Sequence, residues 1–268
     1  MTLPFAKYQG AGNDFVICDD RAGKLSPLLS TERIAHICDR RFGVGADGFM
    51  LLAAATDGYD FTMDYYNSDG RRSTMCGNGG RCIVQFAADL GIRRAVYRFL
   101  AIDGPHEAEI QSPGMVSLSM SDVGQINAAG DAYVLDTGSP HFVRFVSQLD
   151  DVAVVPEARQ VRYAEPFRGS GINVNFVQDH GDYLRIATYE RGVEDETLAC
   201  GTGVTAAALA HRYRHHASGG DGTFRVAVQA RGGELEVLGK RTGSRFENIR
   251  LLGPATYVFS GEITLEGA

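Results

Sequence analysis

The sequence predicts a mixed α/β (α+β) protein of two pseudo-symmetric domains, each a curled, mostly antiparallel sheet around a central helix. Three observations predict this class. The candidate strands are short and separated by Gly or Asp turns, two segments of small residues have the pattern of buried helices, and the chain matches itself at one fixed offset. We expect the functional site in the cleft between the two domains.

The strands and helices follow from local patterns. Runs of β-branched, aromatic or alternating residues predict strands at 134–135, 142–146, 173–178, 183–189, 225–229 and 234–238. Helices are predicted at 80–90, closed by Gly91, and from 203 to about 215. A third helix is predicted at 31–40, with Ser30 or Thr31 as its N-cap.

The internal repeat appears when the chain is shifted by 124 residues, which is the separation of Cys76 and Cys200. At this offset five pairs coincide: Tyr59 and Tyr183, Tyr65 and Tyr189, Cys76 and Cys200, Gly77 and Gly201, Gly79 and Gly203. Each half runs strand, polar turn, Cys-Gly-x-Gly, helix. The sequence therefore predicts a duplicated unit, with halves at 1–125, completed by about 257–268, and 126–256.

Composition narrows the classes of function. The net charge of −7 and the lack of a basic stripe argue against a nucleic-acid or anionic-membrane partner. The start of the chain lacks the pattern of an export signal, and no apolar run has the length of a membrane span, so we expect a cytoplasmic protein. Five cysteines without a C-x-x-C pair argue against a disulfide framework and a zinc site.

The paired Cys-Gly-x-Gly units point to proton transfer. The glycines permit a tight entry into a helix, which places each cysteine at a helix N-terminus, where the backbone N–H groups bind anions and favour thiolate. Inverting a carbon centre needs a base on one face and an acid on the other, and a thiolate with a thiol supplies both. None of the three lysines lies in a glycine-rich phosphate cup, so we expect no pyridoxal. We also expect no metal, because no Cys and His residues stand together at ligand spacing.

Seven segments together resemble the diaminopimelate epimerase family and follow its order over nearly the whole chain. They are GAGNDFV at 10–16, GVGADG at 43–48, YNSDG at 66–70, MCGNGGRC at 75–82, GSPH at 138–141, YERG at 189–192 and ACGTG at 199–203. The closing GPATYVFSG at 253–261 is also similar. The resemblance implies pyridoxal-independent epimerisation of LL- to meso-diaminopimelate, serving lysine and cell-wall precursor biosynthesis, by a protein that forms a homodimer.

The resemblance also implies roles for individual residues. Cys76 and Cys200 match the two catalytic thiols, and His141 and Glu190 match residues that support catalysis. The positions that match substrate contacts are Asn13, Asn67, Gly77, Asn78, Asn173, Glu190, Arg191, Gly201 and Thr202. Asn173 is favoured over Asn175, and Phe259 falls where the family often has an interface tyrosine.

Three departures affect the substrate contacts. Gly48 stands where some members have Gln, Ser139 stands where many have Asn, and Glu190 lies one residue farther from the second cysteine than in some members. The alternative is another cofactor-independent racemase, acting on proline, hydroxyproline or histidine. Two further classes are a non-catalytic small-molecule binder, or an isomerase of the same fold that lacks the cysteines, and a thiol redox protein; the presence of both thiols argues against the first of these. Cys18, Cys38 and Cys82 are interpreted as packing residues, and the His-rich run at 211–216 as a helix end rather than a metal site.

Overall fold

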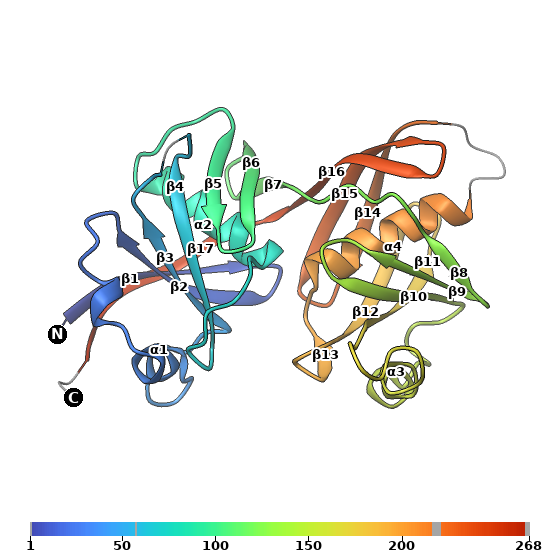
Figure 1. The fold of residues 1–268 in the computed structure, drawn as a ribbon, viewed down its shortest axis with the longest axis horizontal. Coiled ribbons are helices and arrows are strands. Elements are labelled where there is room, and N and C mark those ends of the chain that lie inside the picture. Colours follow the sequence, from blue (N-terminus) through green and yellow to red (C-terminus); the bar gives the residue numbers. More distant parts are fainter. Residues whose placement is uncertain (1, 57, 216–220, 266–268) are drawn as a thin grey trace. The chain divides into compact units, whose positions relative to one another are not determined.

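A computed structural model describes residues 2–56, 58–215 and 221–265. The chain divides into two compact units, drawn in Figure 1. Unit 1 contains Met1–Leu118 and Pro254–Ala268, and unit 2 contains Ser119–Gly253. The sequence placed these boundaries at about 125 and 256. The cleft expected between the two domains stays a prediction.

Unit 1 is one sheet with two helices. Its strands are β1 (Thr2–Gly10), β2 (Asn13–Asp20), β3 (Gly48–Ala53), β4 (Phe61–Asn67), β5 (Tyr97–Ala101), β6 (Gly104–Ser112), β7 (Met115–Ser119) and β17 (Thr256–Thr264). They pair in the order β17-β1-β2-β3-β4-β5-β6-β7, in which β2–β3 and β4–β5 are parallel and the other pairs antiparallel. A short 3-10 turn, η1 (Ser26–Leu28), and α1 (Thr31–Cys38) connect β2 to β3, and α2 (Gly77–Asp89) lies between β4 and β5.

Unit 2 has the same plan. Its strands are β8 (Asn127–Ala129), β9 (Ala132–Asp136), β10 (Pro140–Val146), β11 (Asn173–Asp179), β12 (Tyr183–Glu190), β14 (Gly222–Ala230), β15 (Gly233–Thr242) and β16 (Arg245–Pro254). They pair in the order β8-β9-β10-β11-β12-β14-β15-β16, with β10–β11 and β12–β14 parallel. The short β13 (Asp195–Thr197) adds to β12. Helix α3 (Val154–Arg162) connects β10 to β11, and α4 (Gly201–Arg214) connects β12 to β14.

The two units therefore share strand order, strand direction and helix positions, which confirms the duplication. In each sheet, a helix connects the two strands of every parallel pair. Parallel neighbours need such a crossover connection, whereas antiparallel neighbours can be joined by a tight turn.

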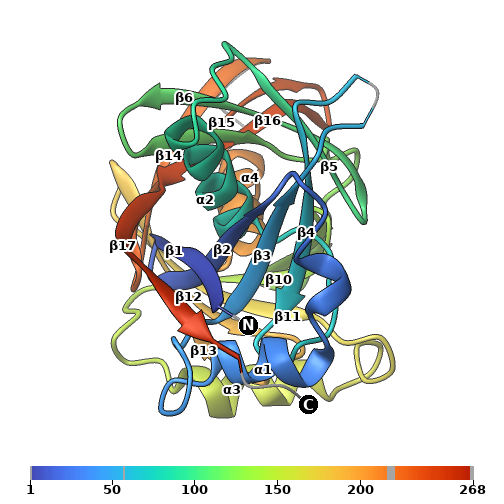
Figure 2. The same ribbon diagram turned by 90° about the vertical axis from the view of Figure 1, so that its left-hand side faces the viewer.

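The second helix of each unit forms its core. Helix α2 packs against β1, β2, β3, β6 and β17, and Figure 2 shows the sheet of unit 1 curving around it. Helix α4 packs against β9, β10, β11, β12, β14 and β15. Six apolar residues of α4 are fully buried: Val204, Ala206, Ala207, Ala208, Leu209 and Ala210. A helix that is apolar on every side belongs in a core, and small residues let the sheet wrap closely around it.

The predicted helices are present with shifted ends. Helix α1 ends at Cys38, two residues early, and Ser30 is its N-cap, with Oγ accepting from Arg33 N at 3.3 Å. Helices α2 and α4 begin at Gly77 and Gly201, before the predicted starts, because the cysteines are their N-caps. Helix α3 was not predicted. Within the described residues no helix is both long and apolar enough to cross a membrane.

Candidate active site

Each thiol sits at the start of a central helix. Cys76 is the N-cap of α2 and Cys200 the N-cap of α4, both with extended backbone. Their carbonyls accept the first helical bonds, from Gly80 N at 2.7 Å and Val204 N at 2.8 Å. The N–H groups of a first helical turn carry partial positive charge. An anion beside either sulfur would therefore lie at the positive end of a helix, as the sequence predicts.

The other three cysteines are in a different environment. All five cysteines lie among the described residues and all are thiols. Cys18, Cys38 and Cys82 are at most 3% exposed. Burial raises the pKa of Cys38 and of Cys82 to about 12, and raises that of Cys18 as well. These three thiols are protonated at neutral pH and inert, which agrees with their interpretation as packing residues.

Cys200 is the end of a hydrogen-bond chain in unit 2. Its Sγ lies 3.3 Å from Thr202 Oγ1, which lies 3.1 Å from Ser139 Oγ. Ser139 Oγ in turn lies 3.0 Å from His141 Nε2, and His141 Nδ1 lies 3.1 Å from Asn175 Nδ2. The chain connects the N-terminus of α4 to the neighbouring strands β10 and β11.

A backbone carbonyl fixes the direction of the hydrogen bonds at the His141 end of this chain. Asn175 Nδ2 also donates to Phe142 O at 2.9 Å, and a carbonyl can only accept, so the amide nitrogen must face it. His141 Nδ1 therefore accepts, and Nε2 carries the proton that is donated to Ser139. Burial lowers the pKa of His141 to about 3, so the ring is neutral, as this arrangement requires.

Asn173 fixes the remaining proton positions. Its Nδ2 donates to Pro140 O and to Ser139 Oγ, both at 3.1 Å. Ser139 thus accepts from both Asn173 and His141, which leaves its own hydroxyl proton for Thr202. Thr202 then donates to Cys200 Sγ. A sulfur that receives an O–H donor is favoured as thiolate.

In unit 1 a buried polar network holds the first turn of α2. Asn78 Nδ2 donates to Asn13 Oδ1 at 2.6 Å, and Asn78 Oδ1 accepts from Arg81 at 2.9 Å. Arg81 is fully buried and also donates to Pro254 O at 3.2 Å and Gly77 O at 3.4 Å. The predicted substrate amide Asn13 is therefore tied to the helix that begins with Cys76.

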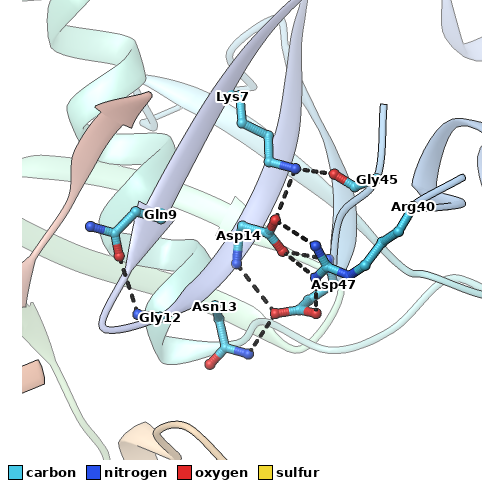
Figure 3. A network of polar contacts seen from close by, with 8 residues as sticks. All are labelled: Lys7, Gln9, Gly12, Asn13, Asp14, Arg40, Gly45 and Asp47. Carbon is cyan, nitrogen blue, oxygen red and sulfur yellow. Dashed lines mark hydrogen bonds and ion pairs between the residues drawn. The ribbon is translucent and has the colours of Figure 1, made fainter. Parts of the chain in front are cut away.

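A group of four charged residues fixes Asn13 from the other side (Figure 3). Asn13 Nδ2 donates to Asp47 Oδ2 at 2.9 Å, and Asp47 Oδ1 pairs with Arg40 at 2.7 Å. Arg40 also contacts both carboxylate oxygens of Asp14, which pairs with the buried Lys7 at 2.9 Å. Burial alone would raise the pKa of Asp14, but hydrogen bonds from Arg40 and Lys7 lower it to about 2.

The remaining predicted contact residues lie at equivalent strand ends. Asn67 ends β4 and is exposed, and Glu190 ends β12 and is half-buried. Arg191 follows, exposed, with its N–H bonded to Asn173 Oδ1 at 2.8 Å and Nη1 bonded to Ser170 O at 2.9 Å. Two predicted contact residues of unit 2, Asn173 and Arg191, are thus bonded to each other.

Comparison with known proteins identifies the family. The model of the family described as diaminopimelate epimerase matches residues 5–126 and 133–258, which is almost the whole chain. The chain belongs to the diaminopimelate epimerase family.

Two relatives of this family align with the chain over nearly their whole length. The diaminopimelate epimerase of Flavobacterium psychrophilum is 46% identical over 96% of this chain and 98% of the relative. That of Chlorobaculum tepidum is 42% identical over 96% of this chain and 99% of the relative. Among solved structures, a PhzF-family phenazine biosynthesis protein of Bacillus anthracis has a TM-score of 0.75 at 15% identity, covering 99% of this chain and 100% of that chain. This last likeness supports the fold alone.

Two departures from the diaminopimelate epimerase pattern have physical reasons here. A Cβ at Gly48 would lie 2.5 Å from the ring of Tyr65, so the space where some members place a Gln side chain is filled by that ring. Ser139 supplies a hydroxyl that both accepts and donates, which lets it connect His141 to Thr202.

Sequence reasoning missed residues that hydrogen-bond to the predicted site residues and hold them in place. Arg81 and Asp47 contact predicted site residues but were given no role, although Arg81 lies inside the MCGNGGRC segment. Asn175 was considered only as the less favoured substrate amide, and it contacts His141. A charged residue among glycines and small residues at the start of a core helix was the available signal, because a buried arginine must be fully hydrogen-bonded.

Proposed function

We propose that this protein interconverts LL- and meso-diaminopimelate by a two-base mechanism that uses Cys76 and Cys200. One observation carries the proposal: two units of identical topology each place a cysteine as the N-cap of the central helix. The reaction would supply a precursor for lysine and cell-wall biosynthesis.

The reaction is a proton transfer on two faces of one carbon. The resting thiolate, which we assign to Cys200, takes the α-proton, and the thiol of Cys76 gives its proton to the opposite face. The products are the inverted centre, a Cys200 thiol and a Cys76 thiolate. The reverse reaction starts from that state, so protons balance without a cofactor.

The developing charge falls on the substrate carboxylate. Backbone N–H groups at Gly77 and Asn78 and at Gly201 and Thr202 would stabilise it, because fixed dipoles aimed at developing charge lower the barrier without reorganisation. Glu190 and Arg191 would recognise the distal ammonium and carboxylate, with Asn13, Asn67 and Asn173 as further contacts. His141 would act through Ser139 and Thr202 as a positioning residue.

A second candidate is a racemase acting on proline, hydroxyproline or histidine. A probable proline racemase of Agrobacterium radiobacter has the same fold, with a TM-score of 0.69 at 15% identity over 98% of this chain and 93% of that chain. Proline-type relatives tend to carry Cys-Gly-His at the first thiol, and this chain carries Cys76-Gly77-Asn78. The charged pair at Glu190 and Arg191 suits a substrate with a second zwitterionic end.

Independence from pyridoxal, a cytoplasmic location and the homodimer stay predictions from the sequence.

The test is α-proton exchange in deuterium oxide with purified protein that shows no pyridoxal absorbance. LL-diaminopimelate should epimerise and take up solvent deuterium, and proline should not. Cys76→Ser and Cys200→Ser should each lose at least 100-fold in epimerisation, since one face then lacks its acid or base. Full activity on proline without activity on diaminopimelate would exclude diaminopimelate as the substrate. Near-normal epimerisation by either serine variant would exclude the two-thiol mechanism.

A further inference from the structure

Two histidines and an aspartate converge at the far end of α4 from Cys200. His211 lies in the last turn of α4 and His215, four residues later, is its C-cap, so both side chains lie on the same side of the helix end. Asp179 ends β11. Its Oδ2 lies 3.2 Å from His211 Nε2 and 3.1 Å from His215 Nε2. The three potential ligand atoms lie within 4.8 Å of one another.

From this arrangement we propose that Asp179, His211 and His215 form a binding site for a divalent transition-metal ion, with Zn²⁺ as the best match. Zinc binds histidine nitrogen and carboxylate oxygen at about 2.0–2.2 Å in tetrahedral sites, which places neighbouring ligand atoms roughly 3.4 Å apart. The two O–N separations are close to that spacing. A set of two imidazoles and one carboxylate with an open fourth position is typical of zinc and its neighbours in the transition series.

The surroundings hold the three ligands in place. The other carboxylate oxygen of Asp179 accepts from Gly181 N at 2.9 Å in the β11–β12 turn, which directs Oδ2 toward the two rings. The His211 ring packs against Phe145, with centroids 6.5 Å apart, and its side chain is 17% exposed. The His215 side chain is 49% exposed, so the site is open to solvent on one side and an ion can enter.

The site is separate from the proposed chemistry. His211 follows Cys200 by eleven residues, roughly 16 Å along the axis of α4. An ion here would connect the last turn of α4 to the β11–β12 turn, and so would stabilise unit 2 rather than take part in proton transfer. The run at 211–216 was interpreted as a helix end because basic residues in a last turn complement the helix dipole. The third ligand, Asp179, lies far away in the sequence and was not considered. His216 of that run lies outside the described residues.

Zinc binding is measured by calorimetry on the full chain carrying Cys76→Ser and Cys200→Ser, which removes the competing reactive thiols. We expect one equivalent of Zn²⁺, and Co²⁺ should give visible absorption without the near-ultraviolet band of thiolate ligation. Saturating Zn²⁺, at about 100 times its Kd, should raise the Tm by roughly 5–10 °C.

Three variants in this background locate the site. His215→Gln, at a half-exposed position that the fold tolerates, and Asp179→Asn should each weaken Zn²⁺ binding at least 10-fold and abolish the Tm rise. His180→Gln is the matched control, because His180 is exposed in the same turn and stacks on Tyr183 instead of facing Asp179. No binding by the parent chain, or equal binding by His215→Gln, would show an ordinary Asp–His hydrogen-bonded cluster and overturn the proposal.

Discussion

At the scale of single residues, the environment of a sulfur decides whether it can act as a base. Cys82 lies inside α2 with no exposure, and burial holds its pKa at about 12. Cys200 lies at a helix start and is in contact with the Thr202 hydroxyl. The same side chain is therefore a packing residue in one place and a candidate base in the other.

The role of Thr202 can be tested on the sulfur itself. In a Cys76→Ser background, replacing Thr202 with Val removes the O–H donor to Cys200. A hydrogen bond to a charged acceptor contributes about 1.5–3 kcal/mol. The curve of alkylation rate against pH, measured with iodoacetamide and peptide mapping, should therefore move up by about 1–2 pH units.

The control for this change is one turn farther along the same helix. Thr205 is buried, and its hydroxyl donates to Gly201 O rather than to sulfur. Thr205→Val should leave the alkylation curve unchanged. Ser139→Ala should give part of the Thr202→Val effect, because Thr202 then loses the donor that orients it. Equal curves for Thr202→Val and the parent would rule out the hydrogen-bond chain as the cause of thiolate formation.

At the scale of elements, the two helix starts are similar in sequence but differ in packing. Gly203 is tightly enclosed, since a Cβ there would lie 2.6 Å from Asn175 Oδ1 and 3.3 Å from Cys200 Cβ. Its repeat partner Gly79 has ordinary clearance, with the nearest atom, Met50 Sδ, at 3.4 Å. In unit 2 the absence of a side chain at Gly203 therefore lets α4 lie close against β11. In unit 1 no such close contact is made at Gly79.

Alanine at these two positions should have opposite effects on stability. Gly203→Ala should lower the free energy of unfolding by about 1–3 kcal/mol, because Asn175 and α4 must separate. Gly79→Ala should be neutral or stabilising by up to about 1 kcal/mol, because alanine is the better helix former. Urea unfolding of both variants decides this. An equal loss in both would mean that contact distance does not set the cost.

The Lys7–Asp14–Arg40–Asp47 group predicts a pH dependence of stability. The folded pKa of Asp14, about 2, lies below its ordinary value of 3.8, so the stabilisation is present above pH 4 and is lost as the pH falls toward 2. Solvent screening limits the effect to about 1–2 kcal/mol. Asp14→Asn should be less stable than the parent at pH 7, and the two should converge near pH 2.

Asp19→Asn is the control for this prediction on the same strand. Asp19 pairs with Arg21 at 2.6 Å, but their side chains are 32% and 42% exposed. Exposed pairs contribute less than about 1 kcal/mol. Unfolding monitored by circular dichroism between pH 2 and pH 7 should therefore show little difference from the parent. A constant gap between Asp14→Asn and the parent at every pH would assign the loss to packing rather than to charge.

The sequence predicted the strands and helix starts that depend on local residue patterns. The strand at 225–229 lies within β14, and both Cys-Gly-x-Gly segments open helices as expected. It could not predict which polar side chains meet. The link from His141 to Asn175 depends on the parallel register of β10 and β11, and the buried position of Arg81 depends on Pro254 returning beside α2. Such contacts join residues far apart in the chain.

At the scale of the whole molecule, the last strand returns to complete the first unit. Strand β17 pairs with β1, and within the described residues this is its one strand partner in unit 1. Tyr257, Val258 and Phe259 on it are 50%, 49% and 44% exposed. An exposed strand edge that carries three large apolar residues favours association unless something covers it.

We therefore predict that the protein is a homodimer in which β17 lies at the interface, as the position of Phe259 implies. Phe259→Lys should convert the dimer to monomer at micromolar concentration, because an aromatic residue at the centre of an interface contributes about 2 kcal/mol or more, a factor of about 30 in Kd. Light scattering after size exclusion measures the mass of the particle in solution.

Phe42→Lys is the matched control, since Phe42 is 78% exposed and lies in a loop. A parent chain that is monomeric at these concentrations, or a Phe259→Lys variant that stays dimeric, would place the interface elsewhere. The Tm of Phe259→Lys separates loss of the dimer from loss of the Phe5 contact, whose ring centroid lies 5.9 Å away.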